Sequence, residues 1–282
     1  MPAPPPDARS FLATVREVRP SGDDGAVLCL DPPEPLPALR AARFFMLRRE
    51  DGLSPAIPRP FSIYRQLEDG GLEFLLKIVG RGTRALAQSA PGTRLRAIGP
   101  LGLGWPTLDG SGAPWAMLAG GIGSVPFYMG IEQALAGMDG ARPARAADLT
   151  LIYGAATAGM LYELEAFAAL GARTLAATDD GSRGFHGNVV EALEEELRAG
   201  RLPAAVRLLA CGPEPMMAAV AERARALELE CWLSLETLMG CGVGICNGCA
   251  VFTRPEGPLG AWPVAKCCVE GPVFPAAAIE VG

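Results

Sequence analysis

Histidine is almost absent from this chain, whose 282 residues include only His186. A metal site built from several histidines, or a catalytic relay that depends on a histidine base, is therefore all but excluded. Positive charge is also scarce, because 25 Lys and Arg stand against 31 Asp and Glu. The formal net charge of −6 argues against nucleic acid as a partner.

The sequence also lacks the hydrophobic segments that targeting or membrane insertion requires. Residues 1–9 contain no apolar stretch of the kind found in signal peptides, so we expect a short disordered lead there. The longest apolar run, Trp115 to Ile131, is interrupted by four glycines and a proline. A buried strand that turns into a helix explains this run better than a membrane span does. We therefore expect a cytoplasmic protein without a membrane partner.

Residues 10–106 have the pattern of an antiparallel β-barrel or sandwich. Short extended runs alternate there with Gly, Pro and Asp, which is typical of many short strands joined by turns. The expected strands are Phe11–Val18, Ala26–Leu30, Phe44–Leu47, Phe61–Tyr64, Gly71–Val79 and Arg94–Ile98.

Residues 107–234 have a different pattern, in which strands and helices alternate. Expected strands at Trp115–Leu118, Leu149–Tyr153, Thr174–Thr178 and Val206–Ala210 are separated by helices that begin near Val125, Leu161, Val189 and Pro215. This alternation predicts βαβ units and a parallel sheet. Residues 235–282 remain as a small third segment, and the length of the chain fits two domains or three small ones.

The third segment holds five of the eight cysteines, in the order Cys241, Cys246, Cys249, Cys267 and Cys268. The spacing C-x4-C-x2-C…C is that of a plant-type [2Fe–2S] cluster, in which four thiolates converge on two irons. Glycines between the first three cysteines suit a loop that must wrap a cluster closely. Zinc is the alternative metal, although it usually pairs two C-x2-C knuckles. Disulfides are a further alternative, which a reducing compartment disfavours.

The fourth ligand of such a cluster is either Cys267 or Cys268. In an extended segment the two neighbouring side chains point to opposite faces, so only one of them can reach the cluster. The residues themselves leave this choice open.

Two glycine turns predict a nucleotide site. Gly120, Gly121 and Gly123 follow the first expected strand of the α/β segment, and a helix opens directly after them. Small residues before a helix N-terminus let the backbone approach a diphosphate, although such a turn can also serve packing alone. A second turn, Cys211-Gly212-Pro213, follows a later strand.

The third expected strand is followed by Asp179, whose carboxylate can accept hydrogen bonds from the ribose 2′-hydroxyl of NAD(H). Arg183 lies nearby and leaves NADP open, because a guanidinium suits a 2′-phosphate. The barrel segment adds Arg59 and Ser62, and then a Gly-Arg-Gly-Thr stretch that suits a phosphate. A surface cation is the simpler interpretation of Arg59 from its pattern alone.

Several motifs together carry a resemblance to a known family. They are Arg59-Pro-Phe-Ser-Ile, Gly80-Arg-Gly-Thr, Gly99-Pro-Leu-Gly, Ala119-Gly-Gly-Ile-Gly and Cys211-Gly-Pro. In this order they resemble the ferredoxin–NADP reductase superfamily. The cysteine loop and the later Cys268-Val-Glu-Gly-Pro-Val-Phe are similar to the electron-transfer subunits of NAD-dependent dihydroorotate dehydrogenases.

The resemblance implies a fold and a set of cofactor sites. The fold is an FAD-binding β-barrel, an α/β parallel-sheet nucleotide-binding domain and a small C-terminal [2Fe–2S] domain. FAD would contact Arg59 and Ser62, with Pro60, Phe61 and Ile63 beside it and its diphosphate at Gly82 and Thr83. The cluster would lie on Cys241, Cys246, Cys249 and Cys268. Cys268 is preferred because the family's last ligand stands two residues before the acidic-Gly-Pro-Val-Phe tail, which here begins at Glu270.

The resemblance also implies a place in pyrimidine biosynthesis. Electrons would pass from an FMN-containing dihydroorotate dehydrogenase subunit through the cluster and FAD to NAD+, in a heterotetramer of two catalytic and two electron-transfer subunits. The chain has no site for dihydroorotate and is expected not to oxidise it alone. Ile245, Phe274 and Pro275 are candidates for an apolar docking face or, alternatively, for the core of the small segment.

Two other functions remain. One is a diaphorase subunit of a cytoplasmic hydrogenase or of an NADH-dependent ferredoxin–NADP oxidoreductase. The other is a non-catalytic interaction protein whose C-terminal segment is held together by zinc.

Overall fold

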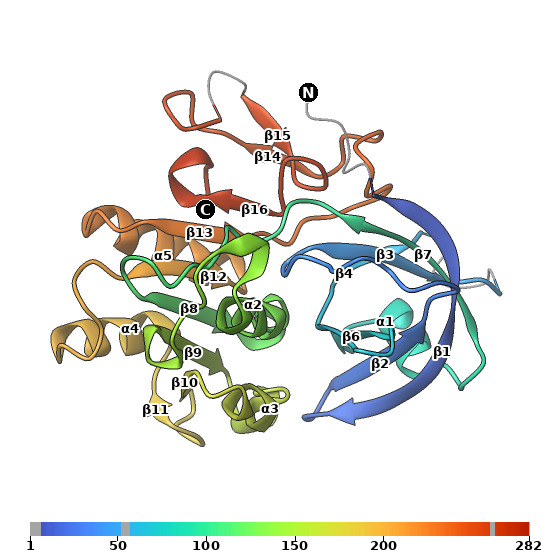
Figure 1. The fold of residues 1–282 in the computed structure, drawn as a ribbon, viewed down its shortest axis with the longest axis horizontal. Helices are drawn as coiled ribbons and strands as arrows, with labels where there is room; N and C mark the ends of the chain where they lie inside the picture. The colour runs from blue at the N-terminus through green and yellow to red at the C-terminus, as the bar shows by residue number, and fades with distance from the viewer. Residues whose placement is uncertain (1–6, 52–56, 260–262, 282) are drawn as a thin grey trace.

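The structure is a computed structural model that describes residues 7–51, 57–259 and 263–281 (Figure 1). Most of the lead expected over residues 1–9 lies outside the described residues. Asp7 and Arg9 lie within them, and the carboxylate of Asp7 pairs with Arg43 at 2.6 Å. The first strand begins at Arg9.

The N-terminal part is a curled antiparallel sheet of seven strands in the order β4-β3-β7-β1-β2-β6-β5. Its strands are β1 (Arg9–Ser21), β2 (Gly25–Asp31), β3 (Phe44–Arg49), β4 (Arg59–Ser62), β5 (Arg65–Gln66), β6 (Leu72–Lys77) and β7 (Arg94–Leu101). All six strands expected here exist, although β4 ends two residues before the expected end at Tyr64.

The shift of β4 has a structural reason, because the chain changes partners at Ile63 and Tyr64. The Ile63 N–H donates to the Arg43 carbonyl beside β3 at 3.0 Å, and the Tyr64 N–H donates to the Glu73 carbonyl of β6 at 2.9 Å. Both side chains are fully buried. Two consecutive residues thus join the two edges of the sheet and curl it into a barrel.

The stretch Gly80-Arg-Gly-Thr forms the start of a short helix, α1 (Arg81–Ala87), which the sequence did not predict. Thr83 closes its first turn, because its hydroxyl accepts the N–H groups of Val79 and Gly80 at 3.0 and 3.1 Å. The composition is typical of a loop, and this capping contact together with the burial of Leu86 in the barrel core stabilises it as a helix.

The second sheet has seven strands in the order β11-β10-β9-β8-β12-β13-β16. They are β8 (Trp115–Gly120), β9 (Leu149–Ala155), β10 (Arg173–Thr178), β11 (Phe185–His186), β12 (Arg207–Cys211), β13 (Cys231–Ser234) and β16 (Val273–Pro275). All pairs are parallel except β13 with β16. The strand order reverses direction between β8 and β12, which is where open α/β sheets bind ligands.

Helices cover both faces of this sheet: α2 (Val125–Ala136), α3 (Leu164–Ala169), α4 (Val189–Arg198) and α5 (Glu214–Ala226). Figure 1 shows α2 and α3 between the sheet and the barrel, and α4 and α5 on the far side. The barrel and the inner helices share one apolar core, within which Trp105 stacks on Phe127 at 5.3 Å.

The interpretation of the apolar run from Trp115 to Ile131 is confirmed, since it forms β8 and the start of α2. Within the described residues, no helix combines the length and apolarity that crossing a membrane would need.

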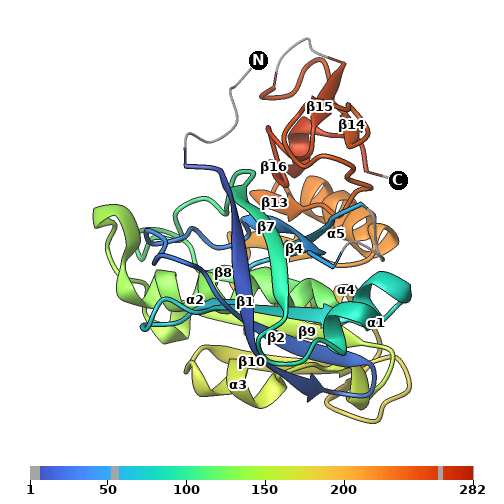
Figure 2. The ribbon, with the colours of Figure 1, turned by 90° about the vertical axis from the view of Figure 1, so that its right-hand side faces the viewer.

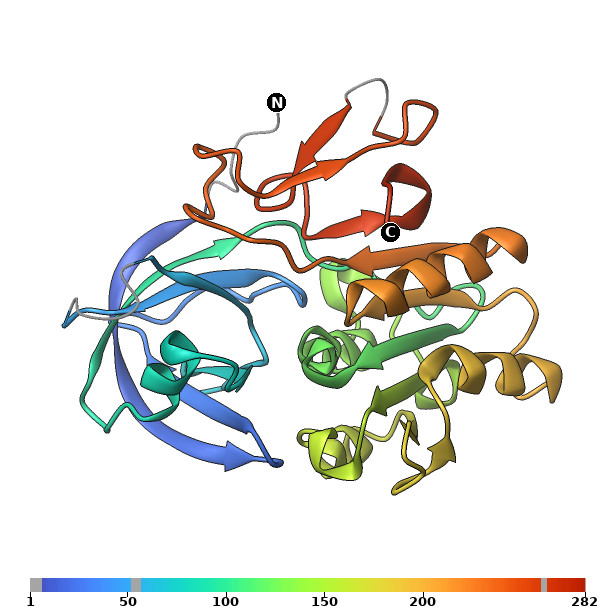
Figure 3. The same cartoon turned by 180° about the vertical axis from the view of Figure 1, so that it is seen from behind.

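The C-terminal segment lies across both sheets (Figures 1 and 3). A two-stranded sheet, β14 (Ala250–Phe252) with β15 (Val264–Lys266), forms its outer part, and β16 then returns to the edge of the second sheet. The cysteine loop rests on the barrel, because a Cβ at Gly242 would lie 2.5 Å from Met46 and 3.1 Å from Leu101. Figure 2 shows this segment above the ends of β1 and β7.

The barrel and the second sheet are also joined by polar contacts far from this segment. The Arg19 guanidinium of β1 holds the Glu163 carboxylate through two hydrogen bonds, of 2.9 and 2.7 Å. The Ser21 hydroxyl donates to the same carboxylate at 2.7 Å. Glu163 directly precedes α3, so the contact ties the barrel to that helix.

Candidate functional site

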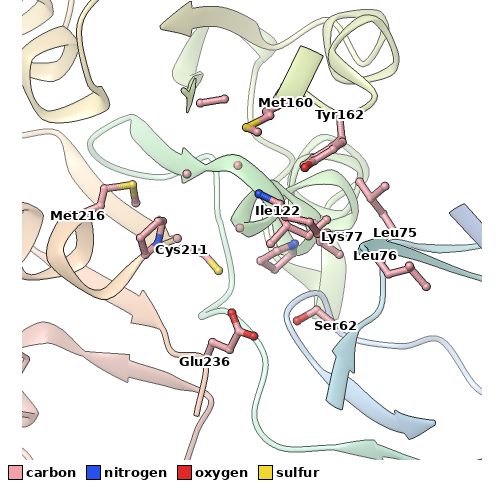
Figure 4. A pocket seen from close by; sticks show the side chains of 18 of the residues that line it. Ser62, Leu75, Leu76, Lys77, Ile122, Met160, Tyr162, Cys211, Met216 and Glu236 are labelled. Atoms are coloured by element: carbon pink, nitrogen blue, oxygen red, sulfur yellow. The ribbon is translucent and has the colours of Figure 1, made fainter. Parts of the chain in front are cut away.

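A cavity of about 660 Å³ opens at the carboxyl ends of β8 and β12 (Figure 4). Its walls come from the barrel, from the second sheet and from the segment that leads into the cysteine loop, namely Leu235, Glu236, Thr237 and Met239. A volume of this order fits a cofactor-sized ligand. Its position is the one expected from the reversal of strand order.

The two glycine turns meet at the floor of this cavity. A Cβ at Gly123 would lie 2.3 Å from the Cys211 carbonyl oxygen, and one at Gly120 would lie 2.7 Å from Pro213. Gly121 has φ +53° and faces open space. Glycine is therefore required at Gly120 and Gly123 by packing, and at Gly121 by backbone conformation.

The structure brings most of the nucleotide-site residues expected from sequence to one cavity. The lining includes Pro60, Phe61, Ser62, Thr83, Gly120, Gly121, Gly123, Asp179, Cys211, Gly212 and Pro213.

Three expected residues, Arg59, Ile63 and Gly82, are not among the lining residues. Ile63 is fully buried in the barrel core, where it belongs to the edge-joining segment. Arg59 is exposed, and its guanidinium donates to the Ile57 carbonyl at 3.0 Å. For Arg59 the geometry is that of a surface cation. Thr83 does line the cavity, but its hydroxyl already accepts two backbone N–H groups and donates to the Gly80 carbonyl.

Asp179 lies on the cavity wall at the end of β10, whereas Arg183 turns away from it. The Arg183 guanidinium pairs with Glu165 at 3.0 Å on the other side of the loop. The carboxylate that suits a ribose hydroxyl is thus placed at the site, and the cation that suits a 2′-phosphate is not.

Sequence reasoning missed several polar residues of the cavity, among them Lys77, Tyr162, Asn188 and Glu236. Figure 4 shows Ser62 and Glu236 reaching the cavity from different segments. Glu236 stands five residues before the first cysteine of the loop, a position that no periodicity singles out. Lys77 could have been singled out from the sequence, because it is one of only two lysines in the chain.

Three of the four proposed cluster cysteines are tied to one another or to loop backbone. The Cys249 and Cys268 sulfurs are 3.2 Å apart. The N–H groups of Val243 and Cys246 each point at the Cys241 sulfur from 3.5 Å. Cys246 is exposed at the tip of the loop.

Cys267 faces the opposite way from Cys268. Its sulfur lies 3.9 Å from the Leu235 carbonyl, and its side chain is fully buried. The Cys267 N–H continues the small sheet by donating to the Cys249 carbonyl at 2.9 Å. The turn that follows β15 thus places the sulfurs of Cys267 and Cys268 in different surroundings.

The pKa values differ sharply along this set. Burial tends to raise the pKa of Cys241, but the N–H groups of Cys246 and Val243 lower it to about 7. Burial raises the pKa of Cys268 to about 12, aided by the neighbouring Cys249. Burial likewise raises the pKa of Cys267 to about 12. Metal binding removes such thiol protons outright, so the values describe the metal-free chain.

These residues fit a [2Fe–2S] cluster better than a single ion. The Cys249 and Cys268 sulfurs lie together, and backbone N–H groups of the glycine-rich loop already point at the Cys241 sulfur, as in cluster sites. In the described part of the chain, no three His, Cys, Asp or Glu side chains form a group that could hold one metal ion. A closed zinc site would need four ligands around one point.

Family models match two parts of the chain. Residues 236–280 match the iron–sulfur cluster binding domain of dihydroorotate dehydrogenase B. Residues 117–222 match the oxidoreductase NAD-binding domain.

Curated relatives match most of the chain. The electron transfer subunit of dihydroorotate dehydrogenase B (NAD(+)) from Desulforamulus reducens is 34% identical over 234 residues, which cover 83% of this chain and 84% of the relative. The subunit of the same name from Geobacillus thermodenitrificans is 36% identical, over 82% of this chain and 83% of the relative.

Solved structures share the fold. The NADH-dependent reduced ferredoxin–NADP oxidoreductase structure superposes with a TM-score of 0.79 at 23% identity, over 95% of this chain and 90% of that one. An Amycolatopsis cytochrome P450 reductase gives a TM-score of 0.65 at 26% identity, over 78% of this chain and 66% of that one.

Proposed function

Since the chain belongs to the family of dihydroorotate dehydrogenase B electron transfer subunits, we propose that it carries electrons between a catalytic dihydroorotate dehydrogenase subunit and NAD(H). It is an NAD-linked oxidoreductase subunit that uses FAD and a [2Fe–2S] cluster, and it serves pyrimidine biosynthesis in the cytoplasm. The cluster passes single electrons, and FAD exchanges two electrons as hydride with the nicotinamide.

One observation carries this proposal. A single cavity is lined by the barrel, by the two glycine turns and by the linker to the cysteine loop. Electron transfer from a cluster to a flavin, and hydride transfer from a flavin to a nicotinamide, both need the groups to lie close together. A cavity shared by all three segments provides that proximity within one chain.

For NAD(H), we assign the diphosphate to the glycine turns and the ribose to Asp179. Gly121 leaves open space over the turn, and the backbone N–H groups that precede α2 are available to an anion there. Cys211, Gly212 and Pro213 form the opposite wall. The placement of Asp179 in the cavity, with Arg183 paired elsewhere, supports NAD over NADP.

For FAD, we assign the barrel side of the cavity, with Pro60, Phe61, Ser62 and Thr83 on its wall. Phe61 offers an apolar ring and Ser62 a hydroxyl, which suits the flat, hydrogen-bonding ring of a flavin. Arg59 would have to leave the Ile57 carbonyl to bind the cofactor, and Ile63 would act only by packing behind Ser62.

For the cluster, we assign Cys241, Cys246, Cys249 and Cys268. The contact of Cys268 with Cys249, and the turn of Cys267 toward Leu235, support Cys268 as the fourth ligand. The glycine-rich loop keeps bulk away from the cluster, and its N–H groups can hold the sulfurs.

Composition analysis of the purified chain tests the cofactors. The chain prepared without oxygen should contain one FAD, two irons and two acid-labile sulfides, and NADH should bleach its visible absorption. A colourless, zinc-containing protein would contradict the proposal. The isolated chain should make no orotate from dihydroorotate, because the catalytic subunit supplies that site; robust turnover would refute this division of labour.

A purification from the native host tests the partner. A flavoprotein of the dihydroorotate dehydrogenase type should co-elute in stoichiometric amount, and the complex should form orotate with NAD+. Co-elution of a nickel hydrogenase, or of a larger flavoprotein with several iron–sulfur clusters, would instead assign the chain to another electron-transfer complex.

A further inference from the structure

Lysine is rare in this chain, which uses 23 arginines and only two lysines among its 25 basic residues. Lys77 lines the cavity. The other, Lys266, is the last residue of β15 and directly precedes the Cys267–Cys268 pair. It has no part in the cofactor sites assigned above, and its contacts are unusual.

The side chain of Lys266 reaches back to the cysteine loop. Its Nζ donates to the Gly244 carbonyl at 2.8 Å, across 22 residues of sequence. Its stem runs beside Gly244, because a Cβ there would lie 3.9 Å from Lys266 Cδ. Its own backbone N–H donates to Glu270 Oε2 at 2.6 Å, which holds the lysine in place from the other side.

The carbonyl that Lys266 holds belongs to a peptide unit with a second role. The Gly244 carbonyl and the Ile245 N–H share one plane and point in opposite directions. Fixing the carbonyl at Lys266 therefore directs the Ile245 N–H away from the lysine. Ile245 lies between Val243 and Cys246, whose N–H groups point at the Cys241 sulfur from 3.5 Å, so the direction of its own N–H bears on the same sulfur.

The loop has little freedom to find this geometry by another route. Gly244 has φ +81°, and a Cβ there would lie 2.7 Å from Val269. The peptide is thus held by Lys266 at its carbonyl and by tight packing at its α-carbon. A hydrogen bond to the carbonyl also polarises the peptide and strengthens the opposite N–H as a donor.

We propose that Lys266 is a positioning residue that raises the reduction potential of the cluster, by orienting the Gly244–Ile245 peptide toward Cys241 and by placing a positive charge beside the loop. The inference rests on the proposed function, since it requires the cluster. Reduction adds one electron to a cluster that carries thiolate charge. Hydrogen bonds to its sulfurs and a nearby cation therefore favour the reduced state.

A redox titration of the purified chain, followed by electron paramagnetic resonance of the reduced cluster, tests this inference. Lys266→Met keeps a flexible, unbranched side chain only one atom shorter and removes the charge and donors. We expect its cluster potential to fall by an amount equal to about a tenfold loss in the reduction equilibrium constant, or about 59 mV for one electron. Lys266→Arg retains a cation and donors and should restore most of the potential.

Glu270→Gln gives a control of opposite sign. The amide keeps an oxygen that accepts the Lys266 N–H but removes a negative charge near the loop, so the potential should rise. If Lys266 and Glu270 only supported the fold, their substitution would not shift the cluster potential in opposite directions. An unchanged potential in Lys266→Met, with full iron content, would overturn the inference.

Loss of the cluster, in a variant or in the unmodified chain, also distinguishes the possibilities. If Lys266→Met folds with normal FAD content but holds no cluster, retention of the cluster in Lys266→Arg supports the positioning role, and equal loss in both variants overturns it. If the unmodified chain itself contains no iron and sulfide, the proposed function fails, which is a separate result.

Discussion

At the residue scale, Cys267 and Cys268 are neighbours in sequence that face different surroundings. We predict that Cys268→Ala lowers the iron and sulfide content more than about tenfold, because a cluster ligand is lost. Cys267→Ala should keep a full cluster and lose only about 1 kcal/mol of stability, because it removes one buried sulfur. Iron and sulfide analysis with thermal unfolding checks both variants, and the reverse pattern would exchange the two assignments.

Asp179 gives a second prediction at this scale. Asp179→Ala should raise the KM for NADH about tenfold, because hydrogen bonds from ribose hydroxyls to a charged acceptor are lost. The preference for NADH over NADPH should also weaken. Steady-state reduction of an artificial electron acceptor measures both effects. Asp180→Asn is the matched control, because Asp180 bonds to Ser182 within its own turn and does not line the cavity. Equal effects in the two variants would argue against a ribose contact.

At the element scale, the two glycine turns depend on close backbone packing. Gly123→Ala places a Cβ 2.3 Å from the Cys211 carbonyl and must separate the turns. We expect NADH-dependent activity to fall by about tenfold or more, since small displacements at a site are costly. Gly130→Ala, inside α2 about two turns further on, is the control: its Cβ would meet Trp105 at an ordinary 3.5 Å, and activity should be unchanged. Normal activity of Gly123→Ala would show that the turns need not touch.

Periodicity predicted the elements whose burial follows a regular pattern. In β1, Phe11, Ala13 and Val15 are buried in alternation, and β8 is an almost continuous apolar run that forms a central strand. The elements that were missed depend on particular contacts. The first turn of α1 is closed locally by its own Thr83 hydroxyl, and three-residue strands such as β14 and β16 exist only where another segment completes their ladder.

The same distinction holds for the site. The glycine turns and cysteines were identifiable because their chemistry constrains the local sequence. Ile63 was expected beside the flavin but is buried in the barrel core, because the sheet edges join there. Phe274 was a candidate for a docking face, yet pairs with Leu233 at the sheet edge and is buried, whereas Ile245 is 80% exposed. Both differences arise from tertiary pairing that local sequence does not record.

At the scale of the whole molecule, the Arg19–Glu163 contact ties the barrel to the nucleotide-binding sheet. We predict that Glu163→Gln lowers the free energy of unfolding by about 1–2 kcal/mol at pH 7, because Arg19 loses its partner. Denaturant unfolding measures this loss. Glu165→Gln is the control: its pair with Arg183 is largely exposed and should contribute less than about 0.5 kcal/mol.

The contribution of Glu163 should depend on pH. Burial raises the pKa of its carboxyl, but hydrogen bonds from Arg19 and Ser21 outweigh this and place the pKa below the ordinary 4.5. A lowered folded-state pKa gives stability that is present above 4.5 and is lost as the pH falls through the folded value. The difference between the native chain and Glu163→Gln should therefore shrink on acidification below that pH. A difference independent of pH would rule out the ion pair as its source.

The return of β16 to the second sheet limits how the C-terminal segment can be removed or transferred to another protein. The cysteine segment leaves the sheet after β13 and comes back to pair with that same strand. A truncation after residue 234 would therefore remove the outer neighbour of β13 and leave that strand as a bare sheet edge, which is prone to aggregation. The cluster-bearing segment is thus not an independent domain that can be removed without changing the second sheet. Transferring it to another reductase would require the donor's β13 as well, because β16 pairs with that strand of the nucleotide-binding sheet.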